Sequence, residues 1–462
     1  MAKPQRVRDP LHDLIEFSVD PFEQKLWDVV NTNEFQRLRR IRQLGFSEFV
    51  YPGATHTRFA HSLGVFSTAR DLCKVIKSRI GPAYDEYRAH VAIAAALVHD
   101  LGHGPFSHAF EEALRAVDRG SGLKHKRHEL WTGDIILSSN ETEIGRVFDE
   151  IDELFTGEQR VTTFKTDVAK LLISETPTDI YHAIVSSQFD ADRLDYMRRD
   201  RMMTGAQHGG FDVSWLMANL EVEKIPLAID EDEFDRVDSL VLGRKALQAA
   251  ESYVLGLFHL YFTVYYHKTT RAFEQMLSAL LARVGFLVVN GDEARTGLSH
   301  NHPILEFLRS RTLADYLRLD DFVIWSAISL MQDCEDAICK ALASRILHRK
   351  PYKAIDVERF FEGRLHKVVV FKSALRGAMA NGEFGDADVF EDTAVRNPYK
   401  RRSGESPEAL SKIWIKTQAD DGCDDLSSQS SVVKQLEERK AYRVYARTDA
   451  IKERLEGLLG RI

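Results

Sequence analysis

Val98-His99-Asp100-Leu101-Gly102-His103-Gly104-Pro105-Phe106-Ser107-His108 places a His-Asp pair at the end of an apolar run, with two more histidines close behind. The apolar run, residues 91–98, predicts a buried helix, and the two glycines and the proline end it. Adjacent residues do not share a helix face, so His99 and Asp100 can meet one ion only where the helix ends. A buried Asp beside a buried His is costly unless something pairs it, and a divalent cation would do so. The stretch therefore predicts a metal site.

The predicted ligands of this metal are His61, His99, Asp100 and Asp192. His61 lies one turn before Val65, on the apolar stripe of a helix predicted over residues 62–80. Two imidazoles and two carboxylates suit Mn, Mg, Fe, Co or Zn and leave positions for water and a phosphate oxygen. We therefore expect a divalent metal cofactor whose identity the sequence leaves open.

The fourth ligand comes from an acidic run in which Asp192, Tyr196 and Asp200 stand four residues apart. On a helix these three side chains occupy one face. Asp190 or Asp195 could replace Asp192 as the ligand, and Asp192 could instead be a charge at the N-terminus of the helix. The face predicts a ligand, an aromatic platform and a hydrogen-bonding carboxylate in one row.

A second group of candidates could move protons or hold phosphate. It contains His103, His108, Glu111 and His128. His108 and Glu111 are three residues apart, so the carboxylate could orient the imidazole as in a general-acid dyad. Arg58 lies three residues before His61 on the same face and could neutralise a phosphate.

The composition is that of an ordinary soluble globular protein, with 44% hydrophobic and 29% charged residues in 462. This length allows one large domain or two. A net charge of −8 gives no global electrostatic case for nucleic-acid binding. The four cysteines form no zinc pattern and no disulfide framework, and neither a signal core nor a stretch close to a membrane span is evident. We expect a cytoplasmic protein with reduced thiols and no membrane partner.

Helical periodicity dominates from about residue 20 to about residue 380. Helices are expected at 23–44, 62–80, 88–100, 107–117, 129–139, 165–174, 178–200, 235–285 and 323–347. The segment 286–322 is mixed, and 160–164 is expected to be a turn or a short strand. The fold class is therefore mainly α.

The texture of the sequence changes after residue 365. Strands are expected at 366–371, 411–416 and 442–446, a surface loop at 420–430, and helices at 431–437 and 449–459. We predict an all-helical core over 1–365, with its metal-binding region at about 50–205, and a small C-terminal α+β lobe over 366–462. The lobe has no catalytic constellation of its own, which favours a regulatory or oligomerisation role.

The whole set of motifs resembles the HD-superfamily deoxynucleoside triphosphate triphosphohydrolases, both the bacterial dGTPase-like enzymes and the HD core of the human sterile-alpha-motif-and-HD-domain enzyme. The matching segments are 9–12, 35–45, 52–64, the His-Asp stretch, 190–200 and 264–268. They follow one order over roughly residues 5–350. The resemblance implies an all-helical HD core and the hydrolysis of dNTPs to deoxynucleoside and tripolyphosphate by water attack on the α-phosphate.

The resemblance also implies a role for each matching residue. It implies metal ligation by His61, His99, Asp100 and Asp192, and catalytic roles for His108, Glu111, His128 and His103. Phosphate contacts would come from Arg58, Arg193 and Lys268, contacts to the sugar 3′-hydroxyl from Gln43 and Asp200, and packing on the sugar from Tyr196 and Tyr265. Leu44 would crowd the 2′ position and so reject ribose.

Some positions depart from the family pattern. Leu257 stands eight residues before Tyr265, where relatives usually carry a phosphate-binding Arg. A smaller phosphate would need fewer cations, so this position favours a different substrate. Regulatory positions are retained at Gln36, Arg39 and Arg345, whereas Asn31 and Asn219 depart from that pocket.

Three functions are open at this point. The first is a metal-dependent dNTP triphosphohydrolase that lowers dNTP pools, with antiviral defence as one biological role. The second is an HD phosphohydrolase acting on a nucleoside monophosphate, a signalling nucleotide or a nucleic-acid end. The third is a nucleotide- or DNA-binding oligomer with a vestigial metal site. Expected partners are a deoxynucleotide substrate, a nucleotide activator and further copies of the chain, in a tetramer or hexamer.

Overall fold

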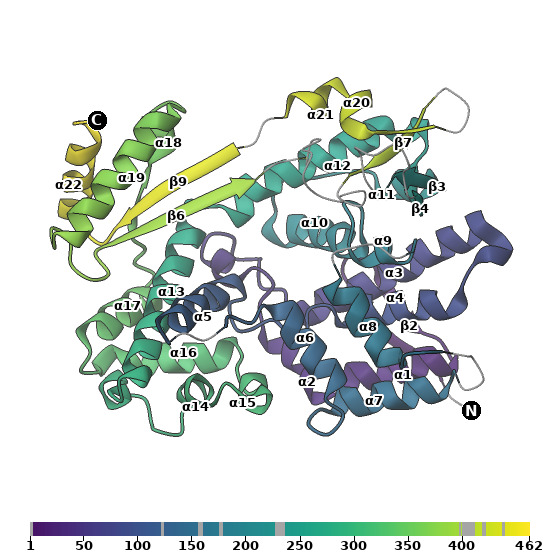
Figure 1. Cartoon of the computed structure of the whole chain (residues 1–462), viewed down its shortest axis with the longest axis horizontal. Coiled ribbons are helices and arrows are strands. Elements are labelled where there is room, and N and C mark those ends of the chain that lie inside the picture. Colours follow the sequence, from purple (N-terminus) through teal and green to yellow (C-terminus); the bar gives the residue numbers. More distant parts are fainter. Residues whose placement is uncertain are drawn as a thin grey trace.

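The computed structural model describes residues 3–121, 124–155, 160–174, 179–226, 236–396, 399, 412–417, 422–436 and 439–462. Helices dominate the described residues, and small sheets lie at the N-terminus, above the core and in the C-terminal part (Figure 1). The predicted mainly α class is confirmed.

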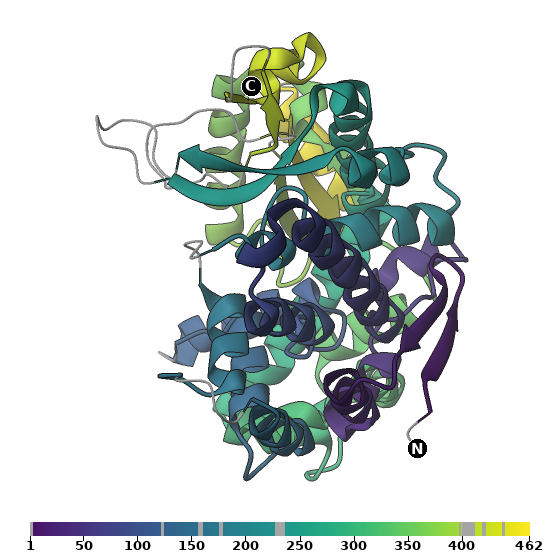
Figure 2. The same cartoon turned by 90° about the vertical axis from the view of Figure 1, so that its right-hand side faces the viewer.

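The chain begins with an antiparallel hairpin beside α1, which the sequence analysis did not foresee (Figure 2). The first elements are β1 (Gln5–Asp9), β2 (Asp13–Phe17), α1 (Pro21–Asn31), α2 (Asn33–Arg37), η1 (Leu38–Arg40) and η2 (Gly45–Phe49). The prediction of one continuous helix over 23–44 is therefore wrong. Thr32 has an extended backbone and its hydroxyl accepts the Phe35 N–H, so it ends α1 and begins α2.

Five helices carry or directly precede the predicted metal ligands and most of the predicted catalytic residues. They are α3 (Arg58–Ile80), α4 (Glu86–Val98), α5 (His108–Ser121), α6 (His128–Leu137) and α10 (Ala191–Thr204). Around them lie η3 (Gly81–Ala83), α7 (Glu143–Glu153), α8 (Phe164–Ile173), α9 (His182–Val185) and α11 (Val213–Ala218). The helix predicted over 178–200 is interrupted before α10, because Asp190 caps that helix by accepting the Arg193 N–H. The segment 160–164 is turn-like up to the start of α8, as predicted.

The next part of the chain holds β3 (Leu220–Pro226), β4 (Arg236–Leu242), η4 (Arg244–Ala246), α12 (Leu247–Leu260), the π-helix η5 (Tyr261–Tyr265) and α13 (Lys268–Val289). The prediction of helix from residue 235 is wrong, because 236–242 pairs with β3 along its whole length. Valines and leucines in this segment suit a strand as well as a helix, and pairing decides between them. After α13 come η6 (Glu293–Thr296), α14 (Pro303–Ser310), α15 (Leu313–Leu317), α16 (Asp321–Leu330), η7 (Met331–Asp333) and α17 (Ala337–Leu347).

Helix α13 is long and apolar enough to cross a membrane by length and composition alone, with a mean hydropathy of 1.6. The expectation that no stretch comes close to a membrane span therefore does not hold for this helix by length and composition. However, 61% of that window is buried inside the protein, where α13 packs against α5 and α17. Phe273, Leu277 and Leu280 of α13 lie in a buried hydrophobic cluster together with residues of α5 and α17. The composition of α13 is therefore explained by burial in the protein.

The C-terminal lobe is a three-stranded antiparallel sheet of order β5-β9-β6, with helices packed against it (Figure 1). Its elements are β5 (Lys353–Asp356), α18 (Val357–Phe360), α19 (Leu365–Ala380), β6 (Val389–Arg396), β9 (Arg439–Ala446) and α22 (Asp449–Leu459). The strand and helix predicted at 442–446 and 449–459 are confirmed. Because β5 pairs with β9, the predicted boundary at 365/366 falls inside this packed unit.

The strand predicted at 366–371 is wrong, because these residues belong to α19. Val368, Phe371, Leu375 and Ala378 are its buried residues, at the spacing of three and four that marks one helix face. The run of valines has high β-propensity, but the side chains that follow continue the helical period. Tertiary packing against the sheet outweighs local propensity here.

The described elements between β6 and β9 pack on the core instead of on the lobe. They are β7 (Trp414–Lys416), β8 (Cys423–Asp425), α20 (Leu426–Gln429) and α21 (Ser431–Gln435). Strand β7 pairs parallel with β4, giving the order β3-β4-β7-β8, and α21 contacts α12. The predicted strand and helix are thus found at 414–416 and 431–435, whereas Ser411 and Glu437 lie outside the described residues. The loop predicted at 420–430 is a strand and a short helix from residue 423.

Candidate active site

The structure brings the four predicted metal ligands together. One ligand atom each of His61, His99 and Asp192 lies within 4.8 Å of the others. Asp100 joins them, with its carboxylate oxygens 3.3 Å from His99 Nε2 and 4.0 Å from His61 Nε2. These residues come from the first turn of α3, the end of α4 and the first turn of α10. Two imidazoles and two carboxylates at such distances fit a divalent metal ion.

His99 is held in the tautomer that a metal ligand needs. Its Nδ1 lies 2.9 Å from the Ala96 carbonyl oxygen, which can only accept, so Nδ1 carries the proton. Its Nε2 is buried and makes no hydrogen bond. A bare, buried nitrogen beside two carboxylates is an atom that a cation would satisfy.

His61 is oriented from behind by a buried carboxylate. Its Nδ1 lies 2.8 Å from Asp195, while its Nε2 lies 2.9 Å from Asp192. Asp195 therefore supports the far side of the ring and is not placed among the ligand atoms. It is held in turn by Arg199 at 2.7 Å and by His12 at 2.7 Å.

The N-terminal hairpin contributes to the hydrogen bonds around Asp195, and this contribution was not predicted from the sequence. His12 lies in the turn between β1 and β2, and Asp9 at the end of β1 pairs with Arg199 at 2.8 Å. The segment 9–12 belongs to the quoted motifs, but its role depends on a contact between His12 and Asp195, 183 residues apart in the chain. Local spacing carries no signal for such a contact.

Gly64 makes room for this carboxylate. A Cβ at Gly64 would lie 1.9 Å from Asp195 Oδ1 and 2.4 Å from a guanidinium nitrogen of Arg199. We expect Gly64→Ala to lower the free energy of unfolding by about 1–3 kcal/mol and to weaken metal binding, because Asp195 must move away from His61. Thermal unfolding and metal titration test this. Gly377→Ala in α19, where a Cβ meets open space, is the control, and equal behaviour of the two variants would contradict the prediction.

The metal-free cluster holds a proton that a metal must displace. Burial alone would lower the pKa of His61, but hydrogen bonds to Asp192 and Asp195 outweigh burial and raise this pKa to about 10. Burial would likewise raise the pKa of Asp100, yet the Arg58 charge holds it well below its usual range. Metal binding at neutral pH therefore releases a proton, and affinity rises with pH.

Two of the predicted phosphate-binding cations already have protein partners. Arg58 is buried, with NH1 2.6 Å from Asp100 and NH2 2.8 Å from the Ser107 hydroxyl. Arg193 donates to the Gln188 side chain at 2.5 Å. A phosphate would therefore bind guanidinium groups that already pair with a carboxylate or donate hydrogen bonds to protein side chains.

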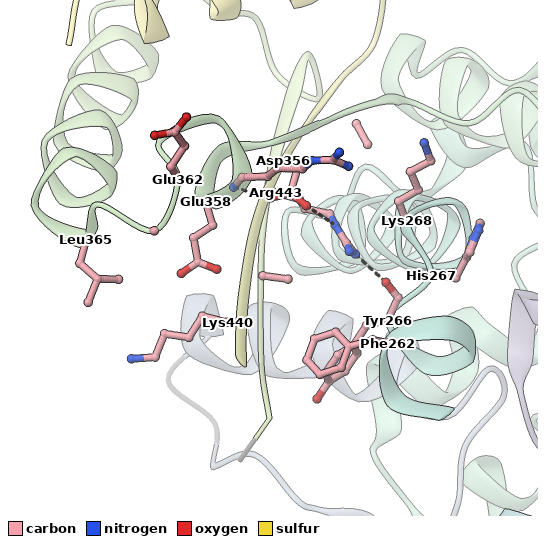
Figure 3. A pocket seen from close by; sticks show the side chains of 14 residues that line it. Phe262, Tyr266, His267, Lys268, Asp356, Glu358, Glu362, Leu365, Lys440 and Arg443 are labelled. Atoms are coloured by element: carbon pink, nitrogen blue, oxygen red, sulfur yellow. Dashed lines mark hydrogen bonds and ion pairs between the residues drawn. The ribbon is translucent and has the colours of Figure 1, made fainter. Parts of the chain in front are cut away.

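The third cation, Lys268, lies elsewhere. It is exposed at the start of α13 and lines a cavity of about 1180 Å³ between the core and the C-terminal lobe, with Asp356 and Arg443 (Figure 3). Leu257, at the position where the resemblance implies an Arg, lies on α12 and is buried among apolar side chains. The described residues around the ligand cluster thus show fewer free cations than the resemblance implies.

A row of histidines leads away from the ligands. His103 Nε2 lies 3.3 Å from Asp100, and the His103 ring stacks on the His128 ring at 3.9 Å. Glu111 accepts both the His128 backbone N–H and its Nδ1, at 2.9 and 2.8 Å. His108 is 3.6 Å from the same carboxylate, and its side chain is 74% exposed. The predicted partner of Glu111 was His108, but His128 is the closer one.

The protonation of these imidazoles differs. Burial lowers the pKa of His103 well below its usual range, and the nearby Arg58 charge adds to this effect. For His128 the hydrogen bond to Glu111 outweighs burial, so its pKa is raised. Of these two stacked imidazoles, the surroundings of His128 therefore favour the protonated form and those of His103 favour the neutral form.

The residues predicted to contact a sugar lie together on the other side. His56 Nε2 lies 2.7 Å from Asp200, whose second oxygen accepts the Tyr265 hydroxyl at 2.7 Å. Gln43 joins them, because its backbone N–H donates to the His56 carbonyl at 3.1 Å. Its side-chain Oε1 is buried without a hydrogen-bond partner.

Two further predicted sugar contacts complete this side. The Tyr196 ring meets the Tyr265 ring edge-on at 6.1 Å, and half-buried Leu44 follows Gln43 at the start of η2. On this side of the site, the role of His56 was not predicted from the sequence; it links the loop of Gln43 to α10.

The predicted regulatory residues are divided between two places. Arg39 donates to Gln36 at 2.8 Å and lies over the Phe59 ring, 3.5 Å from its centre. Arg345 instead donates to the Arg447 carbonyl at 2.6 Å, at the edge of the C-terminal lobe. Their regulatory role stays a prediction.

Comparison with known proteins agrees with this arrangement. The HD domain family matches residues 58–197, and the HD associated region matches residues 229–293. An uncharacterized protein of Bacillus subtilis, YwfO, is 33% identical over 350 residues, which cover 76% of this chain and 71% of that protein. Mouse SAMHD1, named a deoxynucleoside triphosphate triphosphohydrolase, is 29% identical over 293 residues, covering 58% of this chain and 42% of SAMHD1.

Solved structures show the same likeness over nearly the whole chain. A phosphohydrolase from Bacteroides thetaiotaomicron superposes with a TM-score of 0.69 at 25% identity, covering 96% of this chain and 100% of that one. The His-Asp pair described above lies inside the matched HD domain. The chain therefore belongs to the HD-domain family of phosphohydrolases.

Proposed function

We propose that this phosphohydrolase cleaves deoxynucleoside triphosphates into deoxynucleoside and tripolyphosphate. His61, His99, Asp100 and Asp192 would hold the divalent metal, which would polarise a phosphate oxygen and favour water as the nucleophile. The bare Nε2 of His99 supports this ligand set. The activity named for mouse SAMHD1 supports the substrate class.

The observation that carries the nucleoside-sugar part of the proposal is the unpaired Oε1 of Gln43. A buried acceptor without a partner costs about 1–3 kcal/mol, and the 3′-hydroxyl of a sugar would supply the missing hydrogen bond. Leu44, the next residue, would then fill the space that a ribose 2′-hydroxyl needs. Asp200 and Tyr265 lie on the same side as Gln43 through His56.

The row of histidines would supply the proton that the leaving 5′-oxygen needs. Water attack on the α-phosphorus breaks the bond to the 5′-oxygen, and this oxygen must gain a proton as the deoxynucleoside leaves. His128 is suited to donate it, because Glu111 stabilises its imidazolium form. His103 lies between His128 and the metal ligands, close to where the α-phosphate would bind.

A second substrate class is favoured by a different observation. Leu257 is buried and Lys268 lines a separate cavity, while Arg58 is already paired with Asp100. A triphosphate of about −4 charge needs several cations when it is buried. A nucleoside monophosphate, a signalling nucleotide or a nucleic-acid end needs fewer.

Product analysis decides between the two. Purified protein with Mn²⁺ or Mg²⁺ is given each dNTP, each rNTP and dGMP, singly and as a full dNTP mixture. Tripolyphosphate in equal amount to deoxynucleoside supports the proposal, and faster turnover in the mixture supports the nucleotide activator. Orthophosphate from dGMP, with no tripolyphosphate from any substrate, supports the second class instead.

Leu44→Ala tests the sugar side separately. We expect discrimination between dATP and rATP, as a ratio of kcat/KM values, to fall by about 10- to 100-fold, because the cavity left at Leu44 admits the 2′-hydroxyl. Steady-state kinetics with both nucleotides measure it. Leu347→Ala, at an exposed position of α17, is the control. An unchanged ratio would show that Leu44 does not line the sugar pocket.

The remaining predictions concern the cellular setting. We propose a cytoplasmic homo-oligomer acting on dNTP pools, with defence against viruses as one use. Cys73, Cys334, Cys339 and Cys423 are all free thiols, which is consistent with a reducing compartment.

A further inference from the structure

One buried carboxylate joins two loops that carry candidate site residues. Asp321 is the first residue of α16 and is only 3% exposed. Its Oδ2 accepts the Arg42 backbone N–H at 2.8 Å, and its Oδ1 accepts the Phe106 backbone N–H at 2.8 Å. Both oxygens are therefore bound to main chain from segments that lie 64 residues apart in sequence.

The first loop, residues 41–44, carries the sugar-facing side chains. Arg42 directly precedes Gln43 and Leu44, so the position of its amide sets where both side chains start. The loop is also held from the site side, because the Arg58 N–H donates to the Ile41 carbonyl at 3.0 Å. Asp321 holds the loop at the next residue, Arg42.

The second loop, residues 104–108, carries Ser107, which binds Arg58, and ends at His108. Phe106 and Ser107 have φ values of 53° and 50°, a left-handed backbone that costs free energy in residues other than glycine. Ser107 accepts from Arg58, and His108 begins α5. The hydrogen bond from Phe106 to Asp321 stabilises the first residue of this strained pair.

The start of α16 is itself firmly fixed. Asp320 pairs with Arg40 at 2.5 Å, and the Leu319 carbonyl accepts from the buried Arg37 at 2.7 Å. Asp321 thus extends from an anchored segment toward both loops. Burial raises the pKa of Asp321 to about 7, opposed by the hydrogen bonds from the two amides. A carboxylate kept in so unfavourable a place indicates a specific need for its two acceptors.

We propose that Asp321 is a positioning residue that fixes the loop 41–44 relative to the loop 104–108. The groups that contact the sugar and the groups on the phosphate side of one substrate would then be held at a fixed distance from each other. This inference rests on the proposed function for its substrate. A carboxylate suits the task because it accepts two hydrogen bonds without donating any, whereas an amide side chain accepts on one side only.

Asp321→Asn is the direct test, with Asp320→Asn as its matched control. Both variants remove one negative charge at the N-terminus of α16, and asparagine caps a helix as well as aspartate does. Hydrogen–deuterium exchange is followed in peptides covering residues 41–45 and 104–110. In Asp321→Asn we expect at least one of these segments to exchange about tenfold faster or more, and in Asp320→Asn neither. Equal exchange in both variants overturns the inference.

Kinetics supply the readout that a purely structural role would not move. For Asp321→Asn we expect kcat/KM for dATP to fall about tenfold or more, with reduced discrimination against rATP and Mn²⁺ affinity within about twofold of the parent protein. A lower Tm with unchanged kcat, KM and discrimination overturns the inference. If Asp321→Asn does not fold, Asp321→Glu, which keeps both acceptors but displaces them by one bond, provides the same readouts.

The failure of the proposed function is distinguishable from the failure of this inference. Absence of dNTP hydrolysis by the parent protein refutes the proposed function, while the exchange measurement still decides whether Asp321 holds both loops. Hydrolysis by the parent protein, together with control-like exchange and kinetics in Asp321→Asn, refutes only the positioning role.

Discussion

His99→Ala is expected to abolish binding of a divalent metal and to lower turnover by about a thousandfold or more, while the helical fold is retained. The Nε2 of His99 is the one ligand atom of the described cluster that is buried without a hydrogen bond, so no protein group is left unpaired when it is removed. Loss of its other nitrogen, Nδ1, removes only the hydrogen bond to the Ala96 carbonyl at the end of α4. Loss of a metal that supplies several kcal/mol of transition-state stabilisation accounts for the size of the effect.

The structure shows why His99 is a cleaner target than its neighbour. Asp100→Ala would also remove a ligand, but it would leave the buried Arg58 without its carboxylate partner. Breaking such a buried pair from one side costs about 3–5 kcal/mol, so a loss of activity there would be mixed with a loss of folding.

Calorimetric titration with Mn²⁺, circular dichroism and turnover measure the effect of His99→Ala. His348→Ala, at an exposed position that follows α17, is the matched control. In the parent protein the same titration should show affinity rising with pH up to about 10, because the metal displaces the proton of His61. Retained Mn²⁺ binding or retained turnover in His99→Ala would contradict the ligand assignment.

The clustering of these side chains could be predicted in part from sequence, although local rules left Asp190 and Asp195 open beside Asp192. A His-Asp pair at the end of a buried helix must point into the interior where the helix stops. The row Asp192, Tyr196 and Asp200 follows from the helical period alone. The structure places these groups on the elements that those rules predict.

The rest depends on contacts that no local pattern encodes. Glu111 lies three residues from His108 in sequence, and the dyad was predicted on that spacing, yet α6 brings His128 closer to it. Gly102 explains why α6 can approach, since a Cβ there would lie 2.0 Å from the His128 carbonyl oxygen. The contacts of Asp321 are likewise absent from any local pattern, because its partners come from two loops far from it in sequence. A single sequence shows none of these approaches.

Glu111→Gln is expected to lower kcat by about 10²- to 10⁴-fold, the range for loss of general acid–base catalysis. It should also shift the pH profile in a defined direction. Glu111 raises the pKa of His128, so its loss lowers that pKa. If protonated His128 donates to the leaving oxygen, activity falls as pH rises through this pKa. The alkaline limb of kcat must therefore move to lower pH in the variant.

Turnover at saturating Mn²⁺, measured from about pH 5 to pH 9 with phosphate products quantified, tests both parts of this prediction. Glu112→Gln is the matched control, because Glu112 is the next residue of α5 and its carboxylate accepts from Gln275 at 3.1 Å instead of from an imidazole. The control removes the same charge from the same helix and should leave the alkaline limb in place. A fall in kcat with an unshifted limb would mean that Glu111 serves only to position its neighbours. An unchanged kcat would instead leave the exposed His108 to act without this carboxylate, and His108→Ala would then show the larger loss.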